Sequence, residues 1–297
     1  MRPSPILSVL LVLGTAACSR KASPTEYRLY LLAGQSNMEG YGNVAELPVT
    51  ARGLQPGVMI FHGNSSDDPE VADGRGRWVA LRPGHGAGFT SDGDENRYSE
   101  RFGPELAFAS ELRRLDPTAN IAIVKYARGG TSLARLDLEP GWARSSVLTQ
   151  LDHTIAAIER ARSVRDIDHD GAPDTLVAAG IVWMQGESDA NQTEAIARAY
   201  GTNLRATMTQ LRKTLGRDDL PLVIGRISDS RRDSARGRVW KFGDLVRHAQ
   251  EAFVASDPNA ALVDTDHYGY SDALHYDTAG YLDLGAQFAR AMAAAAN

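Results

Sequence analysis

The chain has 297 residues, of which 43% are hydrophobic and 23% charged, and its formal net charge is −5. This composition is typical of a soluble globular protein, and the slight acidic excess argues against a nucleic-acid partner. The length would accommodate one large domain or two small ones.

The first residues predict export. An apolar run over 6–13, too short to span a bilayer as a stable helix, is followed by small residues and then by Cys18, the only cysteine. This arrangement resembles the lipobox of bacterial lipoproteins, in which the cysteine is lipidated. Thr15 stands where the lipobox usually has an aliphatic residue, so an ordinary secretory signal is the alternative. We expect a signal peptide over 1–18 and a polar tether over 19–26. The protein would then be a lipoprotein facing the periplasm or cell surface, with the lipid as its only link to the membrane, or would be secreted or periplasmic.

Apolar, β-rich runs alternate with helix-periodic segments along the rest of the chain. This alternation predicts a parallel sheet with helices on both faces, joined by right-handed crossovers. We therefore expect a single α/β domain over 27–297, a three-layer α/β/α sandwich around a mainly parallel sheet of about five strands. The expected strands are 27–33, 121–127, 176–184, 222–227 and 261–264, and the expected helices are 104–115, 146–162, 193–215, 243–255 and 278–295.

The segment 43–101 interrupts the alternation. It is rich in Gly, Asp and Arg, and only 58–62 and 78–81 have the pattern of short strands. A connection of this length inside a compact domain is often functional. The segment is expected either to form a wall of the substrate site or to be a surface insertion.

Ser36 ends the first predicted strand, where the apolar run stops at Gly-Gln-Ser-Asn. In open α/β sheets, ligands bind at this carboxyl edge. A serine becomes a nucleophile when a base removes its proton, and that base is usually a histidine held by a carboxylate. Asp272 and His275 stand three residues apart, so that one short turn can present both side chains on the same side. Taken alone, a helix-capping serine and a surface Asp–His pair remain the alternative.

Two other strand ends carry candidate donors for an oxyanion. Gly129 and Gly130 follow the strand over 121–127, and a glycine amide can approach a substrate carbonyl without interference from a side chain. Gln185 follows the strand over 176–184, and its amide could donate from the same edge. A Gly-Gly pair after a strand is also commonly a simple turn.

The order of these motifs resembles the SGNH hydrolase superfamily, and within it the branch of sialate O-acetylesterases and acetylxylan esterases. The α/β-hydrolase elbow, Gly-x-Ser-x-Gly, does not fit, because Met38 occupies the place of the second glycine. The matching motifs are Gly34-Gln35-Ser36-Asn37-Met38, Phe102-Gly103-Pro104-Glu105, Gly129-Gly130-Thr131-Ser132-Leu133, Gln185-Gly186-Glu187-Ser188-Asp189 and Asp272-Ala273-Leu274-His275.

The resemblance implies a flavodoxin-like SGNH hydrolase fold and a serine esterase that needs no metal or organic cofactor. It would remove O-acetyl groups from acetylated xylan, sialic acid or another glycan through an acetyl-enzyme. Ser36 would be the nucleophile, His275 the general base and acid, and Asp272 the orienting carboxylate. Turnover would fall as His275 becomes protonated, which for an ordinary histidine occurs at about pH 6–7.

The resemblance also implies how the oxyanion is held. The backbone amides of Ser36 and Gly130 would donate to it, with Gly129 as the other candidate, and the side chain of Gln185 would be the third donor. Glu187 would be structural or substrate-facing, or would be the carboxylate of the triad if Asp272 points away. Two further residues that could support the site or contact substrate are Gln35 and Asn37.

Two other functions are compatible with the same residues: a non-catalytic carbohydrate-binding lipoprotein, or an acetyl transferase. Arg226, at the carboxyl end of the strand over 222–227, could meet an acidic sugar or pair with a nearby aspartate. The aromatic residues that could stack on a sugar, or simply pack, are Trp78, Tyr98, Trp142, Trp240 and Tyr268.

An acidic stretch after the helix over 146–162 has the alternation of a calcium loop. Its acids are Asp166, Asp168, Asp170 and Asp174. Val177 stands where an EF-hand has its bidentate Glu, so a solvated acidic turn is the main expectation and a structural Ca²⁺ the alternative.

Overall fold

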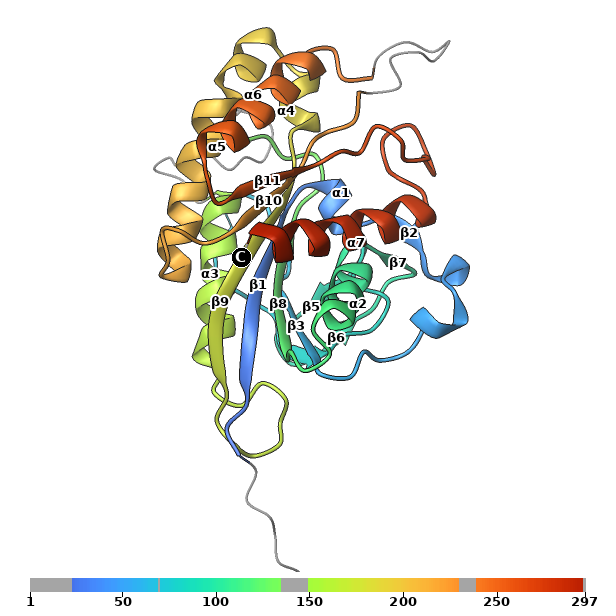
Figure 1. Ribbon diagram of the computed structural model, residues 1–297, viewed down its shortest axis with the longest axis vertical. Coiled ribbons are helices and arrows are strands. Elements are labelled where there is room, and N and C mark those ends of the chain that lie inside the picture. The colour runs from blue at the N-terminus through green and yellow to red at the C-terminus, as the bar shows by residue number, and fades with distance from the viewer. Residues whose placement is uncertain (1–22, 69, 135–148, 230–238, 296–297) are drawn as a thin grey trace, which may run out of the picture.

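The computed structural model describes residues 23–68, 70–134, 149–229 and 239–295. Its centre is a seven-stranded sheet in the order β11-β10-β9-β1-β8-β3-β4 (Figure 1). Every neighbouring pair is parallel except β3 and β4, which are antiparallel. The strands are β1 (Glu26–Gly34), β3 (Val58–His62), β4 (Trp78–Ala80), β8 (Ile121–Ala127), β9 (Thr175–Met184), β10 (Leu222–Gly225) and β11 (Ala260–Val263).

The mainly parallel α/β architecture is confirmed, and the sheet has two strands more than expected. The five predicted strands correspond to β1, β8, β9, β10 and β11. The other two, β3 and β4, come from the irregular segment 43–101 and extend the sheet beyond β8. All five residues of β3 are buried, so this part of the segment belongs to the core. The rest of the segment includes two small antiparallel pairs, β2 (Gly42–Asn43) with β7 (Arg101–Phe102) and β5 (Thr90–Ser91) with β6 (Asn96–Arg97).

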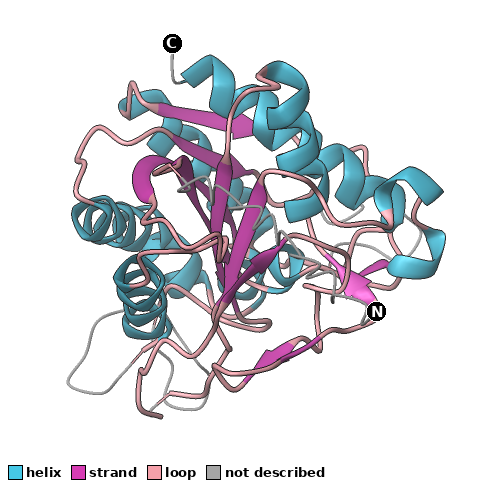
Figure 2. Ribbon diagram, turned by 90° about the horizontal axis from the view of Figure 1, so that it is seen from below, coloured by secondary structure: helices cyan, strands magenta, loops and turns pink. Residues whose placement is uncertain are grey.

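Helices cover both faces of the sheet (Figure 2). On one face α2 (Glu105–Leu115) packs along α7 (Thr278–Ala295), and the other carries α3 (Gln150–Ser163), α5 (Glu194–Leu215) and α6 (Gly243–Ser256). α3 begins four residues later than predicted because Thr149 and Asp152 form a capping box there. α5 ends where predicted, at Gly216, whose positive φ of 84° suits a glycine C-cap.

The N-terminal end of the chain lies outside the described residues up to position 22, so the expected signal peptide and Cys18 have no structural account. Within the described ranges, no helix combines the length and the apolar character needed to cross a membrane.

Candidate active site

Ser36 is the first residue of the one-turn helix α1 (Ser36–Glu39), directly after β1 at the carboxyl edge of the sheet. Gly34 precedes this turn with a φ of 154°, and a Cβ there would lie 1.9 Å from the Met184 carbonyl oxygen of β9. Only glycine fits this close approach of two strands. The side chain of Gln35 then accepts hydrogen bonds at 3.3 Å from the amides of Gly186 and Ser188, which fixes the turn to the loop after β9.

Asp272 and His275 form a hydrogen-bonded pair on the loop before α7. The Asp272 Oδ2 lies 2.8 Å from the His275 Nδ1, and its Oδ1 accepts from the amides of Leu274 and His275 at 2.7 and 2.8 Å. Burial raises the pKa of the Asp272 carboxyl, but the hydrogen bonds from His275 and the two amides outweigh it and leave the pKa below its ordinary value. The carboxylate is therefore ionised and holds the ring by Nδ1, which leaves Nε2 as the nitrogen not bound to Asp272.

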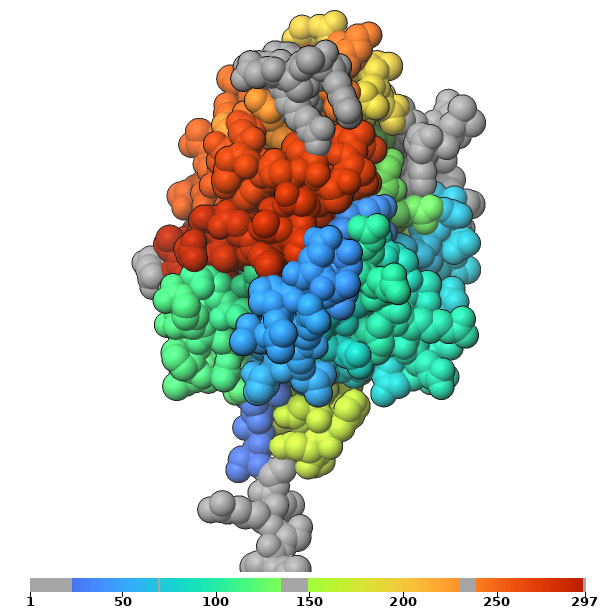
Figure 3. Space-filling model, turned by 90° about the vertical axis from the view of Figure 1, so that its right-hand side faces the viewer, coloured from blue at the N-terminus to red at the C-terminus, as the bar shows by residue number. Residues whose placement is uncertain are grey.

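Asn37 connects the turn of Ser36 to the loop of His275. Its Nδ2 donates to the Leu274 carbonyl at 3.3 Å, and its Oδ1 accepts from the Tyr276 amide at 3.4 Å. Both chain neighbours of His275 are thus bound by the chain neighbour of Ser36. The fold brings together two segments that lie more than two hundred residues apart in the sequence. In Figure 3 the blue segment that follows Ser36 lies against the red C-terminal segment.

Glu187 supports Asn37, and in the described part of the chain no hydrogen bond joins its carboxylate to His275. It begins α4 (Glu187–Asn191), is 2% exposed, and its Oε1 accepts from Asn37 Nδ2 at 2.7 Å. Tyr281 donates from its hydroxyl to Asn37 Oδ1 at 2.8 Å. Burial raises the pKa of the Glu187 carboxyl, and the hydrogen bond from Asn37 opposes this shift. Because Asp272 binds the His275 ring, the alternative in which Glu187 replaces Asp272 has no support here, and a structural or substrate-facing role of Glu187 stays a prediction.

The Gly129–Gly130 turn follows β8 and lies beside Ser36. A Cβ on Gly129 would lie 3.4 Å from the Ser36 Cβ and 2.9 Å from the Glu39 Oε2, so glycine permits this contact. The Gly129 amide donates to the Glu39 carboxylate, whose pKa is raised by burial and lowered by Lys125 and this amide. Gly130 has a φ of 74°, and a Cβ there would meet open space. The Gly129 amide is thus occupied by Glu39, and the oxyanion role of the Gly130 amide stays a prediction.

Gln185 has both amide hydrogens in use. It is fully buried, and its Nε2 donates to the Thr131 carbonyl at 3.1 Å and to Asp189 Oδ2 at 2.6 Å. Asp189 also accepts from the Ser132 hydroxyl at 2.8 Å. In this arrangement Gln185 holds the turn that carries Gly130. The sequence predicts that its side chain donates to the oxyanion, but it has no free amide hydrogen with which to do so.

Two residues of the site have little local signal in the sequence. Tyr41 stacks on His275, with ring centroids 3.6 Å apart and planes inclined by 3°. Lys125, fully buried on β8, donates to the Glu39 and His85 carbonyls at 2.8 and 2.7 Å and to Glu105 Oε2 at 2.7 Å. In the sequence, Lys125 stands out only as a cation within an apolar run. Its structural role could not be predicted, because its three acceptors come from three separate segments.

A polar cleft of about 520 Å³ adjoins this arrangement, which is enough room for a sugar ring. Gly129 connects it to Ser36, and Tyr41 connects it to His275. The insertion after β3 contributes its other wall. The residues that line it are Glu39, Tyr41, Ser65, Ser66, Asp67, Glu70, Arg128 and Gly129.

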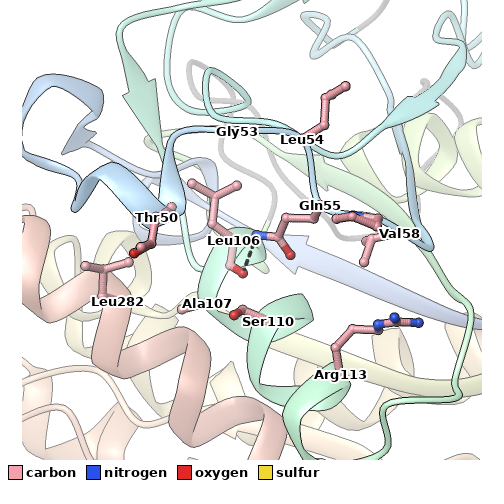
Figure 4. Close-up of a pocket in the computed structure, with 12 residues that line it drawn as sticks. Thr50, Gly53, Leu54, Gln55, Val58, Leu106, Ala107, Ser110, Arg113 and Leu282 are labelled. Carbon is pink, nitrogen blue, oxygen red and sulfur yellow. Dashed lines mark hydrogen bonds between the residues drawn. The ribbon is translucent and has the colours of Figure 1, made fainter.

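A second pocket of about 440 Å³ lies elsewhere, between the chain around residues 50–58, α2 and Leu282 (Figure 4). The Gln55 side chain crosses it and donates to the Leu106 carbonyl at 2.9 Å. Val58 starts β3, so this pocket lies at the amino end of the strand, opposite to Ser36. It plays no part in the catalytic arrangement.

The candidate sugar contacts of the sequence are mostly engaged elsewhere. Arg226 pairs with Glu251 at 2.7 Å, Asp264 at 2.8 Å and Asp266 at 3.0 Å, so the alternative of a nearby acidic partner is the correct one. Tyr98 lies under the Arg82 guanidinium, 4.5 Å from the ring centroid. Trp142 lies outside the described residues. The other three aromatic side chains, Trp78, Trp240 and Tyr268, are buried and pack in the core.

The acidic loop after α3 brings three of its four carboxylates together. Oxygens of Asp166, Asp168 and Asp174 lie within 4.8 Å of one another, whereas the Asp170 carboxylate accepts from the Ala172 amide. The loop precedes β9, at the end of the sheet remote from Ser36. Calcium binding here stays a prediction.

Comparisons with known proteins agree with this fold. A probable carbohydrate esterase of Arabidopsis thaliana is 29% identical over 270 residues, which cover 89% of each chain. The structure of a protein from Arabidopsis thaliana is similar with a TM-score of 0.63 at 23% identity, over 93% of this chain and all of that one. A carbohydrate acetylesterase from Xanthomonas citri gives a TM-score of 0.61 at 19% identity, over 91% of this chain and 56% of that one. At these identities the two structures support the fold alone.

The sequence profile of one family matches residues 26–294, nearly the whole described chain. That family is described as carbohydrate esterase, sialic acid-specific acetylesterase. The predicted resemblance and the predicted enzyme class are thereby confirmed. The chain belongs to this family of carbohydrate esterases.

Proposed function

We propose that this protein is a serine esterase that removes O-acetyl groups from a glycan through an acetyl-enzyme. Ser36 attacks the acetyl carbonyl while His275 takes its proton, and Asp272 holds the imidazole ring. The amides of Ser36 and Gly130 donate to the tetrahedral oxyanion. His275 then protonates the departing sugar hydroxyl, and water hydrolyses the acetyl-enzyme by the same route.

One observation carries this proposal: Asn37 binds both neighbours of His275 and directly follows Ser36. A serine at a sheet edge and an Asp–His pair on a surface loop have structural explanations when each stands alone. The buried amide of Asn37 holds the loop of His275 to the turn of Ser36. A histidine fixed beside a serine in this way is placed to act as the base that deprotonates it. The glycine turn supports the same reading, because Gly129 leaves the space beside the Ser36 Cβ free of a side chain.

Acetate release by the purified chain tests the proposal. Acetylated xylan, O-acetylated sialic acid and an aryl acetate are incubated with the wild type and with Ser36→Ala. We expect acetate from at least one glycan and a loss of several orders of magnitude in kcat for the variant. A Ser36→Ala protein that keeps wild-type rates would contradict the mechanism.

The same assay separates the two other functions. A non-catalytic carbohydrate-binding protein would bind acetylated glycans without releasing acetate from any ester. An acetyl transferase would, in excess acceptor sugar, form a new acetylated sugar at the expense of free acetate. The proposed esterase partitions mainly to water, so added acceptor leaves acetate release unchanged.

We further propose that the protein is exported and held on a membrane by lipidated Cys18, with a soluble secreted or periplasmic form as the alternative. The support is the sequence pattern around Cys18 alone. Fractionation of cells that express the full chain tests it. Membrane association that Cys18→Ser abolishes would favour the lipoprotein, whereas a soluble wild-type protein would favour the secretory alternative.

A further inference from the structure

The cleft beside Ser36 carries more negative than positive charge. Three of its lining residues are carboxylates, Glu39, Asp67 and Glu70, and the one lining cation in the described part of the chain is Arg128. Asp67 already pairs with this guanidinium. An anion that enters the cleft therefore meets an arginine that is already ion-paired, together with two further carboxylates that repel it.

Three other cations of the described chain, Lys125, Arg101 and Arg226, have partners of their own. Lys125 lies behind Glu39, fully buried, and forms an ion pair with Glu105 at 2.7 Å. Arg101 lies outside the lining, where it donates to the Tyr41 carbonyl and sits 5.9 Å from the centre of the Tyr41 ring. Arg226, the residue that the sequence offered for an acidic sugar, is held by three carboxylates.

The position of the cleft makes this charge relevant to specificity. Two of its lining residues contact the proposed catalytic residues: Gly129 lies against the Ser36 Cβ, and Tyr41 stacks on His275. A sugar whose acetyl carbonyl is attacked by Ser36 would therefore lie close to the carboxylates while its ester is bound. Hydroxyl groups of a neutral sugar can donate hydrogen bonds to carboxylates, whereas a sugar carboxylate can only repel them.

We propose that this enzyme acts on O-acetyl groups of uncharged sugars and discriminates against sugars that carry a carboxylate, with Asp67 and Glu70 as specificity-determining residues. This inference rests on the proposed esterase function. It narrows the substrate class to neutral glycans and sets it apart from the sialic acids in the family's description. Specificity here comes from repulsion of the wrong substrate as well as attraction of the right one.

The test compares pairs of substrates that differ only in charge. One pair is O-acetylated N-acetylneuraminic acid and its carboxamide, and the other is an O-acetylated methyl glucuronoside and its carboxamide. Acetate release gives kcat/KM for each. We expect the acids to be turned over at least about tenfold less efficiently than the amides, because like charges brought together in a cleft repel. The difference should shrink at high ionic strength.

Variants then assign the discrimination to the cleft. Glu70→Gln removes one carboxylate, and Asp67→Asn removes another and also frees Arg128, so we expect the acid-to-amide ratio to rise in both and most in Asp67→Asn. The matched control is Asp218→Asn, an exposed carboxylate in the turn before β10 at the opposite end of the sheet, which should leave the ratio unchanged. Each variant is compared with its own rate on the amide, so a general loss of activity does not affect the result.

Three outcomes would overturn the proposal. The first is an equal or higher rate on the acids, above all if Arg128→Gln or Arg101→Gln abolishes it. The second is a low acid-to-amide ratio that neither cleft variant changes. The third is acetate release from the aryl ester but from none of the four sugars. This last result overturns the carbohydrate function itself, whereas the first two leave that function in place.

Discussion

Asn37 is the residue whose replacement should affect both the stability of the fold and the position of His275. It is 2% exposed and uses both amide hydrogens and both lone pairs, on Glu187, Leu274, Tyr276 and Tyr281. In Asn37→Ala the two short bonds, at 2.7 and 2.8 Å, leave a buried carboxylate oxygen and a buried hydroxyl without their partner. Each such loss costs about 1–3 kcal/mol, so we expect a destabilisation of about 2–6 kcal/mol.

The loss of the two longer bonds should affect catalysis. They hold the backbone on both sides of His275, and a displacement of about 1 Å at a reacting group lowers turnover by about 10²-fold. We therefore expect kcat for aryl acetate to fall by about 10²-fold in Asn37→Ala, with a small change in KM. Tyr281→Phe is the milder variant, since it removes one bond to Asn37 and leaves those to the loop of His275. Its kcat should fall by less than tenfold.

Leu211→Ala is the control for stability alone. Leu211 is fully buried on α5, away from the site, and a Leu→Ala change in a core costs about 2–5 kcal/mol. All variants are assayed well below their measured Tm. The reasoning is refuted if Asn37→Ala keeps wild-type kcat, or if Leu211→Ala loses as much kcat for a similar drop in Tm.

Three further predictions concern the triad, the glycine turn and one helix contact. Asp272→Asn should lower kcat by about 10²–10⁴-fold at every pH tested, because an amide no longer stabilises the protonated ring; a wild-type rate would exclude Asp272. Gly129→Ala should lower kcat while the Tm changes little, since its Cβ would lie 2.9 Å from the Glu39 Oε2 and would displace this side chain beside Ser36, and unchanged kinetics would contradict the described turn. Glu111 on α2 accepts from Arg114 and from Arg290 on α7, and these bonds lower its pKa from 4.5 to about 2. Because its folded pKa is depressed, it stabilises above pH 4.5, and this contribution is lost as the pH falls toward 2. Glu111→Gln should thus lower the Tm at pH 7 by an amount that shrinks on acidification, and a constant difference would argue against the ion pair. The effect should be about 1 kcal/mol or less, since both arginines are half exposed or more.

The strands and helices of the α/β frame could be predicted because their signals are local. A buried parallel strand is an apolar run, and an amphipathic helix repeats every three to four residues, whatever the rest of the chain does. β3 and β4 were only suggested, because three to five residues in a glycine-rich segment carry too little periodicity. Their place in the central sheet depends on the pairing of β3 with β8 and of β4 with β3, and the first of these joins segments that lie far apart in the sequence.

The residues of the candidate site likewise fall into those with a local sequence signal and those that only a tertiary contact reveals. Ser36, Asp272 and His275 could be named because each stands in a short motif, and the motifs occur in one order. Tyr41 could not, since its stack on His275 joins positions that no local pattern relates.

The role of Gln185 shows the limit of an argument from residue type. Its amide has the right chemistry for an oxyanion donor, and the sequence places it at the right edge of the sheet. Only the structure reveals that Thr131 and Asp189 take both of its hydrogens.

The central claim is that Ser36 carries the acetyl group during turnover. Purified protein is mixed with an aryl acetate, quenched within the first turnovers, digested and mapped by mass spectrometry. We expect the mass of one acetyl group on the peptide that contains Ser36, and no such peptide from Ser36→Ala. An acetyl group on a different residue, or turnover by Ser36→Ala at the wild-type rate, would contradict the account.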